Sequence, residues 1–367
     1  MRACARLEPP GRDTWGTQTE QGMKMFKNVT VLMTVTLLTV ASAAGAADRD
    51  GSVVVTSSNA PNNQLLVFDT AGGLIQAVPT FGQGGASGNA GGIATNNGMV
   101  AVVNFGSQNV SLFSRREGSF EFRQLVPVSS PPVSVAFGKQ HLYVLGTTTV
   151  ESHRIGSHGI DVGTDGIVGL LLADGSAAQV GVAGDELIIT EKTGVIERVQ
   201  LRAGAVFGVP ASVPLPQGAS DAPFGLVTRG SNAYVTIANS DLVGVVKDGR
   251  PTAFAATGIP GGAGQHAPCW IALVGPFLFT TNSPSHSVSR LIAGGANILL
   301  DAPVAAQTSG APIDIAAEGN LLAIVESDAG GVSHLTQFRI DEDGNLLRVV
   351  SIPIASAANG IAIVIAQ

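Results

Sequence analysis

Two histidines lie close together in the last third of the sequence, on either side of Asn282. His266 stands two residues before an apolar run that begins at Pro268, and His286 follows Asn282. A neutral imidazole can act as general base toward water attacking an ester carbonyl, and a carboxylate such as Glu326 can orient it or serve as acid. We predict His266 and Glu326 as catalytic groups. Two alternatives are a divalent metal site, for which the spacing matches no known motif, and ordinary turn histidines.

Polar side chains recur where one set of β-rich runs ends. The aligned positions, with a shift of one residue at Asn239, are Ser57, Asn104, Gly146, Glu191, Asn239, Asn282 and Glu326. If these ends share one face of the fold, a ring of amides and carboxylates can bind a polyol or sugar acid. The alternative is that these side chains cap strand ends and satisfy the following turns. We predict as ligand-binding residues Asn104, Glu191, Asn239, Asn282 and His286.

Two further charged residues are candidates for ligand binding. Lys192 follows Glu191 and is the only lysine beside the predicted ring, so an anionic ligand would use it or Arg290. The alternative is a solvated pair with Glu191, worth less than about 1 kcal/mol. Asp221 precedes Pro223 at the position that corresponds to His266, where it either binds ligand or caps the strand.

The elements that must position these residues follow from a repeat of about 45 residues. A short phrase of small and apolar residues recurs seven times, with its aligned apolar residues spaced by 42 to 46 positions. These residues are Ile93, Val135, Val180, Leu226, Ile271, Ile315 and Ile361. Each phrase is followed by further runs of four to six β-forming residues, bounded by Gly, Asn, Asp and Pro. Four strands per repeat at this period is typical of a β-propeller blade.

Seven phrases predict an all-β fold, a seven-bladed β-propeller of four-stranded antiparallel blades. Residues 52–56 match a second strand, whereas residues 360–365 match an inner strand with nothing after it. One blade is therefore closed by pairing of N-terminal and C-terminal strands, which hides strand edges. The rival folds are a parallel β-helix and a pair of sandwiches. Residues 48–367 are predicted to form a single propeller domain.

Three features are interpreted through this fold. Asp314 alternates with Ile313 and Ile315, so it either lines the axial channel, where it could bind water or a cation, or belongs to the core. The glycine-rich residues 82–92 predict a flexible loop over one face, as part of a lid. His153 is expected in an exposed turn.

Composition and the N-terminal sequence limit the binding partners and the cellular location that we expect. The formal net charge is −7 and 45% of the residues are hydrophobic, which excludes a disordered chain and argues against binding to nucleic acid. Lys24 and Lys27 precede an apolar run at residues 29–40, and small-residue cleavage sites follow. Residues 1–47 therefore read as an upstream extension plus signal peptide, with a retained membrane anchor as the alternative. We predict a secreted or periplasmic protein with no membrane span after cleavage, and a monomer.

Three segments carry a family resemblance, namely residues 102–113, 268–272 and 279–290. They resemble the seven-bladed lactonase family of propellers, which contains bacterial 6-phosphogluconolactonase and fungal 3-carboxymuconate cyclase, and the related YVTN-type repeats of secreted proteins. The resemblance covers about residues 51–367 and implies lactone hydrolysis by histidine, arginine and glutamate at one mouth, with a His-Pro-His-type turn. No His-Pro-His occurs in this sequence, so no catalytic residue is carried over.

Two functions follow from these observations. The first is an exported hydrolase of a sugar-acid lactone, in which His266 activates water and Asn282 or Asn104 polarises the carbonyl. The alternative is a propeller that binds a carbohydrate, peptide or protein partner on the same face without catalysis, because a fold alone does not decide function. No cofactor and no metal are predicted for either.

Overall fold

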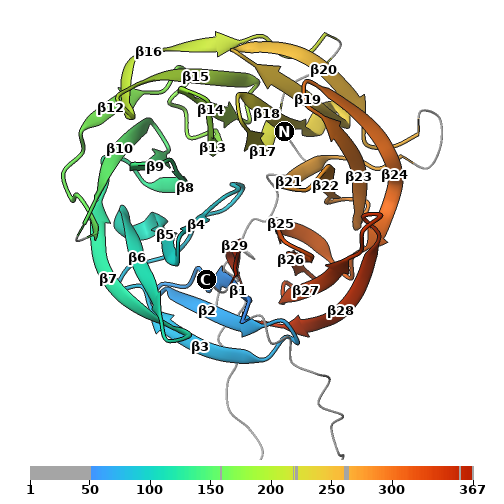
Figure 1. The fold of residues 1–367 in the computed structure, drawn as a ribbon, viewed down its shortest axis with the longest axis horizontal. Coiled ribbons are helices and arrows are strands. Elements are labelled where there is room, and N and C mark those ends of the chain that lie inside the picture. Colours follow the sequence, from blue (N-terminus) through green and yellow to red (C-terminus); the bar gives the residue numbers. More distant parts are fainter. Residues whose placement is uncertain are drawn as a thin grey trace, which may run out of the picture.

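The computed structural model describes residues 51–157, 159–217, 219, 222–259, 264–354 and 357–365. These residues form seven antiparallel β-sheets arranged radially as blades around a central axis (Figure 1). The predicted seven-bladed propeller is therefore confirmed. Among these residues the helical elements are two 3₁₀ turns, η1 (Phe105–Ser107) and η2 (Ala238–Ser240), and neither could cross a bilayer. The predicted signal peptide lies outside the described residues.

The blades are numbered from the N-terminus, and their strands run from the axis outward. Blade 1 contains β29 (Asn359–Val364), β1 (Val53–Ser57), β2 (Gln64–Asp69) and β3 (Leu74–Pro79). Blade 2 contains β4 (Ile93–Asn96), β5 (Met99–Asn104), β6 (Asn109–Arg116) and β7 (Ser119–Pro127). Blade 3 contains β8 (Pro132–Phe137), β9 (His141–Gly146) and β10 (Thr149–Gly156), with the fourth strand split into β11 (Gly159–Ile160) and β12 (Gly166–Gly169).

The remaining four blades are regular. Blade 4 contains β13 (Ala177–Ala183), β14 (Glu186–Glu191), β15 (Val195–Arg202) and β16 (Ala205–Val213). Blade 5 contains β17 (Pro223–Arg229), β18 (Asn232–Ile237), β19 (Leu242–Lys247) and β20 (Arg250–Ala256). Blade 6 contains β21 (Pro268–Val274), β22 (Phe277–Asn282), β23 (Ser287–Gly294) and β24 (Asn297–Gln307). Blade 7 contains β25 (Ala311–Glu318), β26 (Leu321–Ser327), β27 (Ser333–Ile340) and β28 (Leu346–Pro353).

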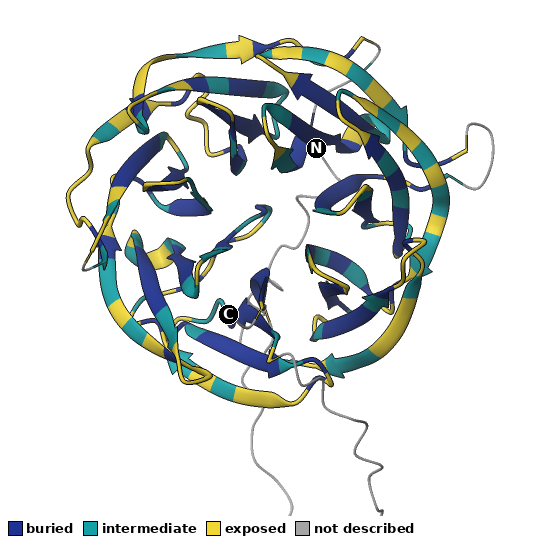
Figure 2. Ribbon diagram, viewed as in Figure 1, coloured by how far each residue is buried: buried dark blue, intermediate teal, exposed yellow. Residues whose placement is uncertain are grey.

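The core lies between neighbouring blades, which explains the pattern of apolar residues. Second strands such as β26 are packed on both faces and are buried throughout, so they read as nearly continuous apolar runs. Outer strands such as β24 alternate between exposed and half-buried residues, because only one face is covered. Figure 2 shows this change from buried inner strands to partly exposed outer strands.

Glycine permits the closest approach of the blades near the axis. A Cβ atom on Gly181 would lie 2.3 Å from the Leu226 side chain of the next blade, and one on Gly225 would lie 2.4 Å from the Cys269 carbonyl oxygen. Both glycines are in inner strands, where the blades converge. Any larger residue there would force neighbouring blades apart.

The two ends of the chain close the ring, as the sequence predicts. In blade 1, β1 pairs with β29, and Val54 lies opposite Ile363. The Thr56 hydroxyl donates to the Gly360 carbonyl oxygen over 2.6 Å. Both sheet neighbours of β1 are thus supplied, β2 from the front of the chain and β29 from its end.

The strand order gives the ring two distinct faces. We call the crossover face the one that carries the loops from each outer strand to the next inner strand and from each second strand to the third. The hairpin face carries the loops between the first and second strands and between the third and fourth strands. His266 and the predicted ring residues lie toward the crossover face, as expected from their positions in the repeat.

Candidate functional site

An aspartate and a histidine meet on the crossover face between blades 5 and 6. The Nδ1 atom of His266 lies 2.8 Å from Oδ2 of Asp241. The other carboxylate oxygen of Asp241 accepts a 2.8 Å hydrogen bond from the backbone N–H of Ala267. Because the carboxylate accepts at Nδ1, it places the imidazole proton there and leaves the Nε2 lone pair available to a ligand.

Local backbone geometry fixes both members of this pair. Asp241 ends the turn η2 in a left-handed conformation (φ 55°), and its backbone N–H bonds to the Ala238 carbonyl. On the other side, the backbone N–H of His266 donates to Ser285 Oγ over 2.8 Å, and this bond fixes the backbone at His266. Ala267 is itself left-handed (φ 51°), a conformation that costs energy for a residue with a Cβ. Such local strain is often found where side chains are held for function.

The imidazole is open to solvent. The side chain of His266 is 63% exposed and that of Asp241 is 37% exposed. A ligand on this face can therefore contact the imidazole ring. The arrangement can hold a neutral histidine as a proton acceptor, with a carboxylate that stabilises the imidazolium once formed.

His286 and Asn239 lie on the same face beside this pair. His286 follows Ser285, which bonds to the His266 backbone, and its side chain is exposed. His286 occupies in blade 6 the left-handed position that Asp241 occupies in blade 5. Asn239 lies within η2, and the residue of blade 5 that ends the second strand as Asn282 does is Ile237. The shift at Asn239 therefore moved that prediction from the strand end into the turn.

Asn104 and Asn282 are fully buried at the ends of their second strands. Asn104 Nδ2 donates to Ser111 Oγ over 2.6 Å, and Asn282 Nδ2 donates to Ser289 Oγ over 2.8 Å. Each serine in turn donates to a backbone carbonyl between blades, that of Thr80 or Thr257. Equivalent residues thus make the same hydrogen-bond arrangement in blades 2 and 6. Both amides are fully buried, whereas the His266 side chain is 63% exposed.

Glu326 is likewise enclosed within its own blade. Its carboxylate accepts hydrogen bonds from the Thr336 hydroxyl and from the backbone N–H of Gly310, and the side chain is fully buried. The carboxylate that meets His266 is therefore Asp241, and Glu326 has its bonds elsewhere. Sequence reasoning missed Asp241, although its alignment with His286 in the next repeat was a signal that could have found it.

Glu191 forms a buried pair of carboxyl groups with Glu197. Burial, together with the adjoining Glu197, raises the pKa of Glu191 to about 8. Glu197 also accepts a 2.8 Å hydrogen bond from the backbone N–H of Leu171. Two carboxyl groups in contact are stable when they share a proton, which agrees with the raised pKa of Glu191.

Lys192 holds the connection between blades 1 and 2, at Gly88. Its ammonium group donates to the carbonyl oxygens of Gly88 (2.8 Å) and Ala177 (3.1 Å) and lies 5.9 Å from the Phe224 ring centroid. Burial lowers the pKa of Lys192 to about 8. The cation that sequence analysis predicts for an anionic ligand is thus bonded to the chain itself.

We call residues 82–92 the plug segment. The Asn89 side chain donates to the Val133 carbonyl over 2.6 Å and accepts from Asn359 Nδ2 over 3.1 Å. The backbone carbonyl of Asn89 accepts from the Trp270 indole N–H. These bonds reach blades 3, 1 and 6, and Lys192 adds blade 4. The predicted flexible lid is therefore wrong: the segment is fixed across the crossover end of the channel.

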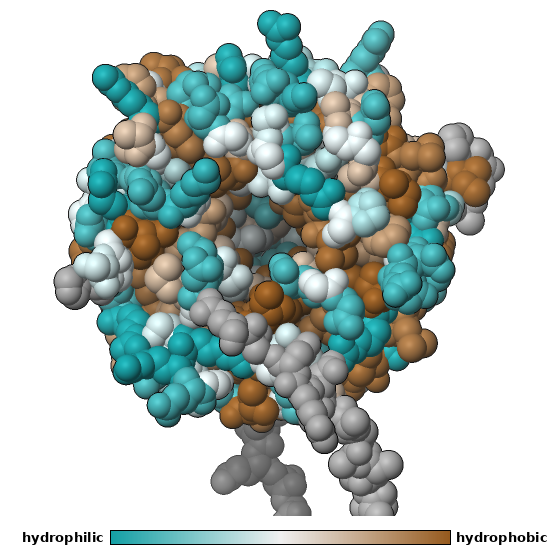
Figure 3. Space-filling view, viewed as in Figure 1, coloured by the Kyte–Doolittle hydropathy of each residue, from teal (hydrophilic) through white to brown (hydrophobic). Residues whose placement is uncertain are grey.

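Asp314 faces the axial channel beneath the plug segment. A cavity of about 330 Å³ there is lined by residues of several inner strands, including Asp314, Gln179 and Trp270. Burial raises the pKa of Asp314 to about 7. Hydrogen bonds from the backbone N–H groups of Ile315, Gly91 and Ile361 to its carboxylate oppose this rise in pKa but are outweighed by burial. Figure 3 shows the central hollow from one side of the ring. Asp314 thus joins the plug segment to blades 7 and 1.

Two remaining candidates resolve differently. Asp221 lies outside the described residues. The expectation that His153 faces solvent is wrong, because its ring is fully buried beside Glu151, with Nδ1 3.1 Å from the Asp161 carbonyl oxygen. Within the described part of the chain, no cluster of three or more His, Cys, Asp or Glu side chains could hold a metal ion.

Solved structures with the same fold come from several bacteria. A 6-phosphogluconolactonase-like protein from Bacteroides fragilis aligns with a TM-score of 0.64 at 14% identity, over 87% of this chain and all of its own. The periplasmic gluconolactonase of Pseudomonas aeruginosa aligns at 0.63 and 17%, over 85% and 98%. A catalytically inactive variant of virginiamycin B lyase from Staphylococcus aureus, solved with quinupristin, aligns at 0.56 and 17%, over 76% and 89%.

Sequence comparisons add no closer relative. No model of a known protein family matches the chain, and no curated protein matches it in sequence. At identities of 14% and 17%, the structural likeness establishes the fold alone. The chain is a seven-bladed β-propeller similar in structure to 6-phosphogluconolactonase-like and gluconolactonase proteins.

Proposed function

We propose that this protein hydrolyses a small lactone on its crossover face, with His266 as general base. The observation that carries the proposal is the 2.8 Å contact between His266 Nδ1 and Asp241, which places the ring proton on Nδ1 of a side chain that is 63% exposed. The fold shared with lactonases agrees with this assignment. Asn239 and His286, which flank the pair on the same face, would contact the substrate hydroxyls.

The reaction consumes one water molecule for each lactone ring that is opened. His266 Nε2 takes a proton from the water, whose oxygen bonds to the lactone carbonyl carbon. The tetrahedral intermediate collapses as the ring C–O bond breaks, and the imidazolium returns the proton to the departing alkoxide oxygen. The product is the open-chain hydroxy acid. Asp241 acts through His266, since its negative charge stabilises the imidazolium.

The test compares turnover of a panel of aldonolactones, with the uncatalysed rate subtracted. We expect His266→Ala to lower kcat by at least about 100-fold and Asp241→Asn by about tenfold or more. The matched control is the pair His334 and Asp328 on the same face, 3.2 Å apart, whose variants His334→Ala and Asp328→Asn should keep full activity. Equal turnover by the His266→Ala variant would refute the role of this base.

The exposure of the imidazole favours a second candidate function. A histidine that is 63% exposed, on an open face, is also suited to contact a carbohydrate, peptide or protein partner without catalysis. Absence of turnover on every lactone by the unaltered protein would exclude the hydrolase. Binding of a soluble glycan or peptide that is weakened by His266→Ala would then support the second candidate.

We also propose that the protein is exported from the cytoplasm and that it is a monomer. The basic and apolar pattern at residues 24–40 supports export. N-terminal sequencing of the protein recovered from a periplasmic fraction should begin shortly after residue 43 or 46. An N-terminus upstream of residue 29 in that material would contradict cleavage.

A further inference from the structure

A small cavity opens on the crossover face between blades 1 and 2, away from His266. It has a volume of about 440 Å³, which is within the range of small-molecule sites. Its walls come from the β1–β2 loop at Asn62, the end of β3, the residues that follow β3, and η1 of blade 2 at Ser107. His266 lies between blades 5 and 6, so blade 7 on one side and blades 3 and 4 on the other separate the two places (Figure 1).

The loops around this cavity are tied to one another by hydrogen bonds of the backbone. The N–H of Asn63 donates to the Gly82 carbonyl oxygen over 3.1 Å, and the N–H of Thr80 donates to the Asn63 carbonyl oxygen over 2.9 Å. The N–H of Gln83 donates to Ser107 Oγ over 2.9 Å, which joins the same loops to blade 2. The cavity is therefore formed by bonds within the chain and needs no ligand to shape it.

Phe81 presents an aromatic ring at this cavity. It is 64% exposed, although its ring meets that of Phe122 edge to face, with centroids 4.5 Å apart. Phe122 meets the fully buried Phe113 in the same way at 6.0 Å, so the core supports the exposed ring from one side. The backbone of Phe81 is left-handed (φ 59°), which costs energy for a residue with a Cβ. An exposed ring that is fixed in this way is suited to stack on an apolar face of a ligand.

Three amide side chains line the cavity with their polar atoms unused. Asn62 and Gln83 are exposed and Gln64 is half-buried. Within the described part of the chain, none of these three amide groups makes a hydrogen bond. The amide of Asn63 differs, because it is buried and donates to Asn104 Oδ1 over 2.9 Å. An amide offers a donor and an acceptor side by side, which matches two neighbouring hydroxyl groups.

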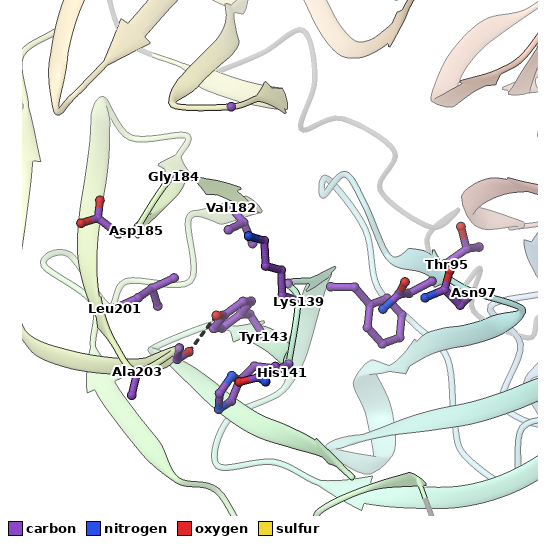
Figure 4. Close-up of a pocket in the computed structure, with 16 residues that line it drawn as sticks. Thr95, Asn97, Lys139, His141, Tyr143, Val182, Gly184, Asp185, Leu201 and Ala203 are labelled. Carbon is purple, nitrogen blue, oxygen red and sulfur yellow. Dashed lines mark hydrogen bonds between the residues drawn. The ribbon is translucent and has the colours of Figure 1, made fainter. Parts of the chain in front are cut away.

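This cavity differs in charge from a larger one on the hairpin face. The larger cavity has a volume of about 1180 Å³, is formed by loops of blades 2 to 5, and has Lys139, His141 and Asp185 in its lining (Figure 4). Among the described residues that line the smaller cavity, none carries a charge. A charged ligand would give up hydration there without gaining an opposite charge, so the smaller cavity favours a neutral ligand.

We propose that the cavity between blades 1 and 2 binds a neutral pyranose sugar. One face of a β-glucosyl ring carries only axial C–H groups and packs on Phe81, while the equatorial hydroxyls bond to the three unused amides. A linear polyol has the hydroxyls but no flat apolar face, and a sugar acid or sugar phosphate brings a charge that the cavity does not match. The site is independent of the proposed lactone hydrolysis, so each proposal can fail without the other.

The probe is cellobiose, with binding to the purified protein followed by saturation-transfer NMR. We expect the strongest saturation at the axial protons of one glucosyl ring, because these protons lie against Phe81. Phe81→Ala should weaken binding about tenfold, and so should Phe81→Leu, which keeps an apolar side chain beside Phe122 but has no flat ring. Gln83→Ala should weaken binding about fivefold, the loss typical of one hydrogen bond. Sorbitol should receive no saturation.

Matched variants keep the result interpretable. Phe207→Ala removes another exposed phenyl ring, and Gln140→Ala removes an exposed amide at the hairpin-face cavity. Both should bind cellobiose as the unaltered protein does, and so should His266→Ala. Absence of saturation transfer to cellobiose, or unaltered binding in both Phe81 variants, would overturn the proposal. Binding that is lost in His266→Ala but kept in Phe81→Ala would place the sugar at the other site and would overturn it as well.

Discussion

At the scale of single residues, the charged groups of this protein divide into buried pairs and exposed pairs. Glu191 and Glu197 are fully buried beside each other within blade 4. Asp241 and His266 have similar chemistry but lie at the surface, where a ligand can reach them. Residue type alone does not separate the two cases. Burial does, because it decides whether a ligand can reach the polar atoms.

The buried pair should make stability depend on pH. The pKa of Glu191 is about 8 in the folded protein and about 4.5 when exposed, so between these values the folded state binds more protons than the unfolded state. Stability therefore falls as pH rises from about 5 to 8, by an amount on the order of a few kcal/mol. Glu191→Gln removes this titration and should flatten the dependence.

Urea unfolding at a series of pH values checks this prediction. Asp314, whose pKa is raised to about 7, contributes a loss of the same sign, so the difference between wild type and Glu191→Gln isolates the pair. Glu342→Gln, at an exposed turn, is the control and should follow wild type. A Glu191→Gln variant that loses as much stability over this range as wild type would contradict the shared proton.

At the scale of elements, the repeat predicts the strands but not the segments that leave the repeat. All seven aligned apolar residues, from Ile93 to Ile361, lie in inner strands. The plug segment has no periodicity, and its position depends on contacts with blades 1, 3, 4 and 6, which are distant in sequence. Asp241 was missed for a similar reason, since its partner His266 is 25 residues away. Local patterns predict strands well and contacts between loops poorly.

The plug segment should be held chiefly by Asn89. Asn89→Ala removes the hydrogen bond to the buried Val133 carbonyl and one of the two hydrogen bonds of the Asn359 amide, and it should cost about 2 kcal/mol. Ser87→Ala, in the same segment but exposed, should have little effect. Urea unfolding measures the loss, and limited proteolysis should show faster cleavage within residues 82–92 only in Asn89→Ala. Equal stability of the two variants would show that Asn89 does not fix the segment.

At the scale of the whole molecule, one blade depends on both ends of the chain. Val54, Phe68 and Ile363 of blade 1 pack with Ala323 and Val325 of blade 7, so β29 supports the contact between two blades as well as its own sheet. The closure was predictable because residues 360–365 match an inner strand and residues 52–56 match a second strand. The cavity on the hairpin face was not, since its loops come from four different repeats.

Removal of β29 should open the ring. A chain that ends at residue 358 leaves one edge of β1 without its partner strand and uncovers the apolar wall of blade 7. We expect a thermal midpoint lower by at least about 10 °C, and self-association through the free edge. Circular dichroism and light scattering measure both, and Ile363→Val is the mild control. A monomer with the wild-type midpoint would show that the ring holds without its last strand.

The pairing of β1 with β29 also sets the order of events during biosynthesis. The first sheet contains six residues that lie about 300 positions after its other strands, so it cannot be complete before they have been made. Closure of the ring therefore requires β29, whatever the order in which the other blades fold.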